Sequence, residues 1–226
     1  MARIVALVPI RHDSERLEGK NYRPLSGIPL YHHIVLSLLS CKEIDEVVID
    51  TDSPLILEEA ARKFPDVRLL ERPESLCDGR VPMNEVLVHD VSQVDADFYL
   101  QTHCTNPLLK AETISRAISA FLESYPRCDS LFGVTRIQKF LWDSVGRPIN
   151  HNPTMLMRTQ DLPAVFEENS NLYLFTAESL LSRRHRLGVR PQMFEIDPIE
   201  AWDIDTGLDF EIAEFLLNRR LEGKES

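Results

Sequence analysis

The sequence lacks the marks of several large protein classes. Its four cysteines (Cys41, Cys77, Cys104 and Cys128) include no C-x-x-C pair, which argues against a zinc site or a disulfide framework and favours a reducing compartment. No apolar run approaches the ~18 residues that would span a membrane. The N-terminal apolar run also lacks the small-residue cleavage site of a signal peptide. We therefore expect a soluble, cytoplasmic protein that has no membrane partner.

Positive charge is also scarce. Lysine and arginine number 25 against 36 aspartate and glutamate residues, which gives a formal net charge of −11. Because nucleic-acid-binding proteins normally present a basic surface, we expect no nucleic-acid partner. An anionic small molecule would have to be drawn in by a local cluster of cations. The 226 residues suffice to bury one good core, and we expect a single domain over residues 1–226.

What the sequence does contain is a regular alternation of short apolar runs and amphipathic stretches. This alternation predicts an α/β fold, with a Rossmann-like, mostly parallel sheet and helices on both faces. The predicted strands cover residues 3–8, 46–50, 67–70, 98–101, 130–136, 172–175 and 193–196, and helices are predicted over 29–41, 54–63, 81–91, 110–124 and 206–221.

The alternation stops at about residues 138–168. This stretch holds three prolines, at positions 148, 153 and 163, together with scattered aromatic residues and methionines. It is long for a plain loop in a compact domain. We therefore expect a small inserted arm here.

The loop after the first predicted strand is basic. It holds four cations: Arg11, Arg16, Lys20 and Arg23. One interpretation is a solvated surface loop whose charge is partly cancelled by Asp13, Glu15 and Glu18. The other is a phosphate-binding loop, because open α/β sheets bind nucleotides where a strand leads through a loop into a helix. Its Gly19-Lys20 pair fits that use, although the loop is not a G-x-x-x-x-G-K-[ST] motif.

A second candidate is the acidic loop before the last predicted helix. In an extended segment Asp203 and Asp205 project to the same side. Two such carboxylates suit Mg²⁺, which usually takes one or two carboxylates together with substrate phosphates. The alternative is an acidic helix entry, in which Asp205 favours the helix dipole. Next to a polyphosphate loop the metal interpretation is favoured.

Two further polar loops follow predicted strands. Thr51-Asp52-Ser53 is typical of a helix N-cap. The loop from Gln101 to Pro107 contains the pair His103-Cys104, but adjacent side chains on an extended chain point apart, which argues against a cysteine nucleophile. Polar contacts with a substrate are the favoured use of this loop.

Taken together, these motifs resemble the acylneuraminate cytidylyltransferases, the CMP-sialic acid synthetase family. That family opens with a pattern close to P-A-R-x-x-S-K-x-x-x-x-K-N-x-x-P, and the segment 9–24 keeps its arginine, serine, second lysine, asparagine and final proline at the same spacing. Further matches, in order along nearly the whole chain, are Thr51-Asp52-Ser53, Arg72-Pro73, Leu100-Gln101, residues 158–163, Glu168-Asn169 and residues 203–206.

The resemblance implies a fold of the nucleotide-diphospho-sugar transferase type and a reaction in which CTP and an acidic 2-keto sugar give a CMP-sugar and pyrophosphate. It implies catalytic roles for Arg11, Lys20, Asp203 and Asp205, with Mg²⁺ on the two aspartates. By the same carry-over the nucleotide would contact Arg11, Ser14, Lys20, Asn21 and Arg72, and the sugar Gln101, Arg158, Gln160, Asn169 and Tyr173. It further implies a homodimer in which the 138–168 arm completes the neighbour's site. The acceptor of the sugar's hydroxyl proton stays open between a carboxylate and a metal-bound water.

The chain also departs from the family pattern. His12 and Asp13 stand where the family has glycines, and Glu15 replaces its loop lysine. Glu167 replaces an arginine close to the sugar, and Ser170-Asn171 replaces Gly-Ala. These changes leave the sugar open between a sialic acid-like nonulosonic acid and an octulosonic acid. Another sugar nucleotidyltransferase and a non-catalytic nucleotide-binding protein are the remaining alternatives, although the retained lysine and aspartates argue against the latter.

Overall fold

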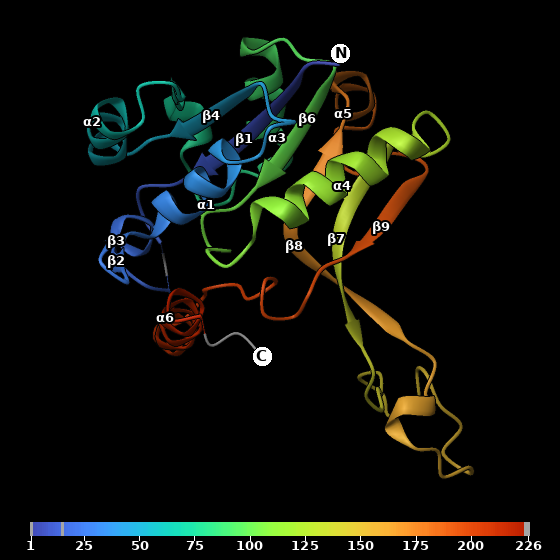
Figure 1. The fold of residues 1–226 in the computed structure, drawn as a ribbon. Helices are drawn as coiled ribbons and strands as arrows, with labels where there is room; N and C mark the ends of the chain where they lie inside the picture. The colour runs from blue at the N-terminus through green and yellow to red at the C-terminus, as the bar shows by residue number, and fades with distance from the viewer. Residues whose placement is uncertain (1, 15, 224–226) are drawn as a thin grey trace.

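The computed structural model describes residues 2–14 and 16–223, and it is built on a seven-stranded sheet (Figure 1). The strand order is β5-β4-β1-β6-β8-β7-β9. Only β8 runs antiparallel to its neighbours among these strands, so the expected mostly parallel sheet is confirmed. The strands are β1 Ile4–Ile10, β4 Glu46–Thr51, β5 Arg68–Glu71, β6 Phe98–Thr102, β7 Ser130–Ile137, β8 Val165–Phe175 and β9 Pro191–Glu195.

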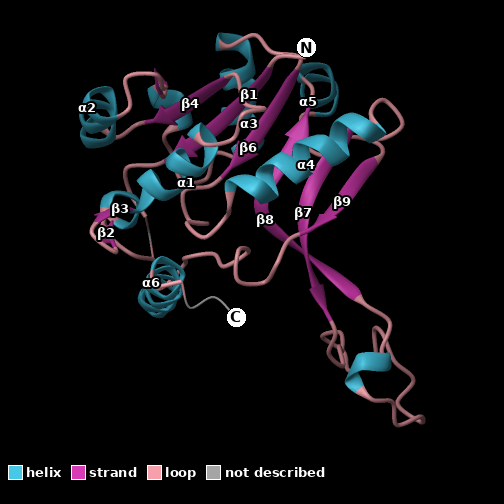
Figure 2. Ribbon diagram, viewed as in Figure 1, coloured by secondary structure: helices cyan, strands magenta, loops and turns pink. Residues whose placement is uncertain are grey.

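Helices cover both faces of this sheet, as the alternation predicts (Figure 2). One buried cluster packs α1, α2 and α4 on one face, and a second packs α3 and α5 on the other. A third, smaller cluster holds α6 against the segment before α1. The helices are α1 Leu30–Leu39, α2 Pro54–Lys63, α3 Met83–Gln93, α4 Ala111–Ser124, α5 Ala177–Arg183 and α6 Gly207–Leu221.

Strand β1 shows why its sequence is apolar throughout. Ile4, Ala6 and Val8 belong to the cluster on one face of the sheet, and Val5 and Leu7 belong to the cluster on the other. All five side chains are buried, because β1 lies between β4 and β6 and has helices above and below it. The strand also continues through Pro9 to Ile10, two residues beyond the predicted end. Its carboxyl end therefore delivers Arg11 to the sheet edge.

Two helix starts follow the capping signals in the sequence. The Ser53 hydroxyl accepts a hydrogen bond from the backbone N–H of Ile56 at the start of α2. At α6 the Thr206 hydroxyl accepts from the backbone N–H of Asp209, and the Asp209 carboxylate accepts from the Thr206 N–H, which completes a capping box. Both caps lie directly after polar loops at the candidate site.

The irregular segment is shorter than predicted. Strand β7 reaches Ile137 and β8 begins at Val165, so residues 165–168 belong to a strand that was predicted to begin only at residue 172. The early part of β8 pairs with β7 as an exposed ribbon and has no buried face, so its sequence shows no apolar alternation. The remaining segment, residues 138–164, projects from this ribbon away from the body (Figure 1). We call it the arm.

The segment between the basic loop and α1 contains a small hairpin that the sequence pattern does not indicate. Strands β2 Pro24–Leu25 and β3 Ile28–Pro29 are joined through Ser26 and Gly27, both of which have positive φ. Before it, the short 3₁₀ helix η1 Lys20–Tyr22 carries the last lysine of the basic loop. Two other such turns, η2 Glu74–Leu76 and η3 Thr159–Asp161, lie after β5 and in the arm. No helix in the described part of the chain is long and apolar enough to cross a bilayer.

Candidate active site

A cleft of 520 Å³ opens at the carboxyl end of β1. We call it the first cleft. Four of the five predicted nucleotide residues line it: Arg11, Ser14, Lys20 and Asn21. Arg16 and His103 also line it, so the basic loop and the loop after β6 form opposite parts of its wall. The structure thus gathers three of the four cations of the loop around one concave site, and Arg23 instead lies over the Phe210 ring. Glu15, which departs from the family pattern, lies outside the described residues.

Lys20 is held in place by the acidic loop. Its side chain is 9% exposed, and its Nζ donates a hydrogen bond of 2.5 Å to the carbonyl oxygen of Ile204. Gly19 precedes it with a φ of 65°, a left-handed conformation that favours glycine. Asn21 fixes the other side of the loop, because its Nδ2 donates to the Arg11 carbonyl at 2.7 Å. These contacts fix Lys20 and Asn21 at the end of the loop.

The start of the loop is fixed by the residues after β4. The backbone N–H of His12 donates to the Asp52 carboxylate at 2.6 Å, and its Nδ1 lies 2.8 Å from the Ser53 hydroxyl. The imidazole also stacks on Tyr22. His12, which stands where the family has glycine, is therefore a structural contact in this chain.

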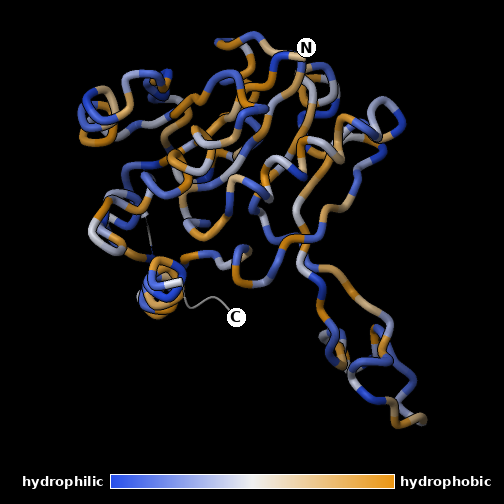
Figure 3. The backbone as a smooth tube through the Cα atoms, in the orientation of Figure 1, coloured by the Kyte–Doolittle hydropathy of each residue, from blue (hydrophilic) through white to orange (hydrophobic). Residues whose placement is uncertain are grey.

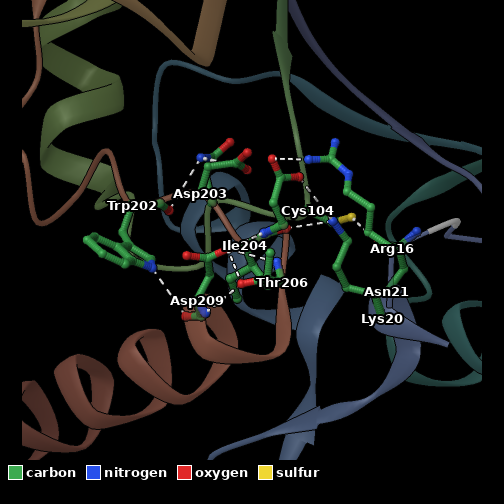
Figure 4. Close-up of polar contacts among 11 residues, drawn as sticks. Arg16, Lys20, Asn21, Cys104, Trp202, Asp203, Ile204, Thr206 and Asp209 are labelled. Atoms are coloured by element: carbon green, nitrogen blue, oxygen red, sulfur yellow. Dashed lines mark hydrogen bonds and ion pairs between the residues drawn. The ribbon is translucent and has the colours of Figure 1, made fainter. Parts of the chain in front are cut away.

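The two aspartates of the acidic loop contact the residues of two different clefts (Figure 4). Asp205 forms ion pairs with Arg16 at 2.5 Å and with Lys20 at 3.8 Å, both at the first cleft. Asp203 lines a second cleft of 390 Å³ together with Asn169. Figure 4 shows Lys20 and Arg16 on one side of Ile204 and Asp203 on the other. The loop thus forms the boundary between the two clefts.

The electrostatics of this loop fit a cation. Partial removal from water raises the pKa of the Asp203 carboxyl, and the nearby negative charge of Asp205 raises it further. The two carboxylates do not face one cleft as the extended-chain prediction has them, because Asp203 lines the second cleft and Asp205 pairs with Arg16 and Lys20. Their oxygen-only donor set suits Mg²⁺, and a magnesium ion held by these aspartates stays a prediction. Among the described residues, the one cluster of three potential ligands is elsewhere: Asp50, His89 and Asp90. There Arg72 already supplies a positive charge to Asp50.

Two of the predicted sugar residues, Gln101 and Tyr173, are fully buried and line neither cleft, so their part in sugar binding stays a prediction. Gln101 is fully buried, and its Nε2 donates to the Nε2 of His103 at 3.0 Å. The Tyr173 hydroxyl donates to the carboxylate of Glu168, which lines the second cleft. Burial raises the pKa of Tyr173 to about 12, so its phenol stays protonated and acts as a donor.

Asn169, a predicted sugar residue, lines the second cleft. Its Nδ2 donates to the Thr135 hydroxyl at 3.0 Å. A Cβ on Gly133 would lie 2.6 Å from the Asn169 Oδ1, so a larger residue at this point of β7 would displace the Asn169 side chain. The strand register shifts at the same place, between Phe132 and Val134. The glycine and the register shift in β7 therefore leave room for the Asn169 side chain.

The other two predicted sugar residues lie on the arm. Arg158 and Gln160 are exposed, and Arg158 forms a bidentate ion pair with Asp161. Because the arm projects away from the body, the structure does not bring these two side chains to the clefts of their own chain (Figure 1). Their part in sugar binding stays a prediction.

Arg72, the fifth predicted nucleotide residue, does not line the first cleft. It is buried and its Nε donates to the Asp50 carboxylate at 2.5 Å. A nucleoside contact for Arg72 therefore also stays a prediction. Arg186, which lines neither cleft, contacts the predicted sugar residues Gln101 and Tyr173. Sequence reasoning did not single it out because it lies in the charged run Arg183-Arg184-His185-Arg186, typical of an exposed surface.

The cysteine of the loop after β6 is not a nucleophile. Burial raises the pKa of the Cys104 thiol to about 12, so it is protonated at neutral pH. Its Sγ donates to the side-chain oxygen of Asn21. Burial, together with the charges of Arg186 and Lys20, lowers the pKa of His103 to about 3, so the imidazole is neutral. The expectation that this pair does not perform thiol chemistry agrees with both values.

Comparison with known proteins identifies the family of this chain. The cytidylyltransferase family model matches residues 5–224. The chain belongs to the cytidylyltransferase family. It is 28% identical to the CMP-N,N'-diacetyllegionaminic acid synthase of Legionella pneumophila over 97% of this chain and 98% of that protein. It is 25% identical to the N-acylneuraminate cytidylyltransferase A of Danio rerio over 93% of this chain and 50% of that protein.

Solved structures show the same cytidylyltransferase fold. A CMP:2-keto-3-deoxy-manno-octonic acid synthetase complexed with CTP matches with a TM-score of 0.73 and 18% identity, covering 97% of this chain and 100% of that one. The family resemblance and the fold class predicted from the sequence are therefore confirmed.

Proposed function

We propose that this cytidylyltransferase transfers the cytidylyl group of CTP to the anomeric hydroxyl of an acidic 2-keto sugar of the nonulosonic class. The bond between the α-phosphorus and the departing pyrophosphate breaks as the sugar oxygen attacks. One observation carries the proposal: the loop with Asp203 and Asp205 lies between a cleft lined by cations and a second cleft lined by polar side chains. The L. pneumophila relative, matched over 98% of its length, supports the choice of sugar class.

Different residues of the chain would bind the phosphates, the metal ion and the sugar. Arg11, Lys20 and Arg16 would bind the phosphates of CTP in the first cleft, where they offset negative charge on the leaving pyrophosphate. Asp203 and Asp205 would hold Mg²⁺, which supplies further charge neutralisation at the α-phosphate when bound. Asn169, Gln101 and Tyr173 would orient the sugar, because phosphoryl transfer depends mainly on positioning and electrostatics.

A pyrophosphate-release assay tests this function. The purified protein is given Mg²⁺, each of the four nucleoside triphosphates in turn, and a panel of sialic, other nonulosonic and octulosonic acids. We expect release only with CTP and a nonulosonic acid. Release with an octulosonic acid alone would overturn the sugar class, and absence of both release and CTP binding would overturn the function.

We also propose that the protein works as a homodimer in which the arm contacts a second copy. The arm carries exposed apolar side chains, among them Trp142 at 51%, Met155 at 61% and Leu156 at 102% exposure, and Figure 3 shows hydrophobic stretches along it. Arg158 and Gln160 would then reach the neighbour's second cleft. Sedimentation of the wild type and a Leu156→Asp variant tests this, and a monomeric wild type would contradict it.

The four cysteines are free thiols, which supports a reducing compartment as the place of action. We propose the cytoplasm, where CTP is available. Fractionation of cells that express the tagged protein measures this directly, and its recovery from an oxidising compartment would contradict it.

A further inference from the structure

Arg186 is a cation enclosed among residues of the candidate sugar site. It lies in the loop between α5 and β9, and its Nη1 donates to the Oε1 of Gln101 at 2.7 Å. Its Cζ lies 3.5 Å from the centre of the Tyr173 ring, so the guanidinium stacks on the phenol. Both partners are fully buried. Burial also lowers the pKa of Arg186, although a guanidinium remains charged in proteins.

Among the described residues Arg186 forms no direct ion pair, although the charge of Glu168 acts on it from nearby. Within the part of the chain that the structure describes, no carboxylate forms an ion pair with it, whereas Arg72 pairs with Asp50 and Arg184 pairs with Glu85. Its nearest acidic neighbour, Glu168, instead accepts a hydrogen bond from the Tyr173 hydroxyl. An enclosed charge is unfavourable unless it is paired. Within the described residues the guanidinium therefore keeps N–H groups that a further anion can occupy.

The neighbours of Arg186 connect it to both clefts. Gln101, which accepts from Arg186, donates to His103 in the wall of the first cleft. Tyr173, which lies under the guanidinium, bonds to Glu168 and Ser170 in the wall of the second. Neutral His103 adds no competing positive charge. An anion on Arg186 would therefore lie beside the place where nucleotide and sugar meet.

We propose that Arg186 binds the carboxylate of the acidic sugar and so selects acids over neutral sugars. This rests on the proposed function. A guanidinium presents N–H groups in a fork that matches a carboxylate, and Gln101 occupies only part of that fork. Arg186 thereby acts as a specificity-determining residue, and Gln101 and Tyr173 hold it in position.

The test compares an acidic sugar with its carboxamide analogue in the full-length enzyme. Wild type is expected to prefer the acid, and Arg186→Met is expected to lose that preference by roughly 10–100-fold, mainly through KM, because a hydrogen bond to a charged group contributes about 1.5–3 kcal/mol. The Kd for CTP is expected to stay unchanged. Arg183→Met, an exposed residue at the end of α5, is the matched control.

The outcomes separate a binding role from a structural one. If Arg186→Met weakens the acid and the carboxamide equally, Arg186 only supports Gln101 and Tyr173, and the inference is overturned. Should that variant not fold, Arg186→Lys decides: an intermediate acid preference supports the inference, and an unchanged one overturns it. If the wild type turns over no acidic sugar at all, the proposed function fails, and the inference fails with it.

Discussion

Two groups of charged residues in this molecule combine aspartates with basic side chains, and they differ in how far these side chains are exposed to solvent. In the core group, Arg72 pairs with Asp50, and Asp90 lies beside them; the side chains of the ion pair are 0% and 1% exposed. In the cleft group, Arg16 and Lys20 pair with Asp205; the side chains of the Arg16–Asp205 pair are 66% and 37% exposed. The first group is closed to solvent, and the second faces an open site.

The difference indicates what each group is for. A closed ion pair has little room for a ligand, so its charges are balanced by one another and support the fold. Charges at a cleft are only loosely balanced, because water screens them, and they can exchange partners when a substrate arrives. Substitutions in the core group should therefore reduce stability, and substitutions in the cleft group should reduce turnover.

The largest effect is expected at Asp203. Asp203→Ala should lower the rate of pyrophosphate release roughly 10²–10³-fold, because it removes a carboxylate placed to hold the cation that neutralises the transition state. The unfolding midpoint should change little, since the side chain is exposed at the second cleft. Steady-state assays and urea unfolding measure the two quantities. Glu211→Ala, on the exposed face of α6, is the control. An Asp203→Ala enzyme with wild-type turnover would contradict the expected role of the cleft group in turnover.

The next largest effect is expected at Arg72, where a substitution should reduce stability more than turnover. Arg72→Met should lower the free energy of unfolding by about 3–5 kcal/mol, because it leaves a buried charge at Asp50 without a partner. Adding Asp50→Asn should restore part of the loss. Urea denaturation of the single and double variants measures this. A stable single variant with a weakened Kd for CTP would instead place Arg72 at the nucleotide, as the sequence predicts.

A smaller effect concerns pH and Asp90. Burial raises the pKa of the Asp90 carboxyl, and the negative charge of Asp50 raises it further. The folded protein therefore keeps a proton there at pH values above about 4, where the unfolded carboxyl is ionised. Because the folded state binds more protons, stability falls as pH rises from there towards the raised pKa. Asp90→Asn should remove this fall in the free energy of unfolding. Urea denaturation of the wild type and the variant at several pH values measures it, and the same dependence of the unfolding free energy on pH in both proteins would contradict the prediction.

The smallest effect is expected at Thr206. Thr206→Ala removes the hydroxyl that accepts from the Asp209 N–H in the capping box of α6, and should lower the free energy of unfolding by about 1 kcal/mol. Thr206→Ser keeps the hydroxyl and should show no such loss. If Thr206→Ala also slows turnover markedly, the cap helps to position the acidic loop, and the division between stability and activity is less sharp than proposed.

Much of this architecture could be predicted from local patterns. The apolar run of β1, the Ser53 cap and the Asp203-Ile204-Asp205-Thr206 segment each carry a signal within a few residues, and the structure has the corresponding strand, helix start and loop. What could not be predicted depends on contacts across the sheet. The early part of β8 forms a strand only because β7 pairs with it outside the core, so no apolar period marks it.

The same limit applies to the site. The sequence singles out Arg72 by its motif and passes over Arg186. Only the fold shows that Arg72 pairs with a carboxylate and that Arg186, within the described residues, contacts Gln101 and Tyr173 instead. The motif around Lys20 identified the first cleft because its residues are close in sequence. The arm residues Arg158 and Gln160 could be assigned only by resemblance, because their proposed contact lies outside a single chain.

The hydrogen bond from the Lys20 Nζ to the Ile204 carbonyl joins residues 184 positions apart. Closing so large a loop is entropically costly, and contacts of high sequence separation form late in folding. During synthesis, the basic loop emerges long before the acidic loop with which it must pair. The catalytic site should thus be the last part of the molecule to become ordered, and a chain released early from the ribosome would contain a nearly complete sheet but no working cleft.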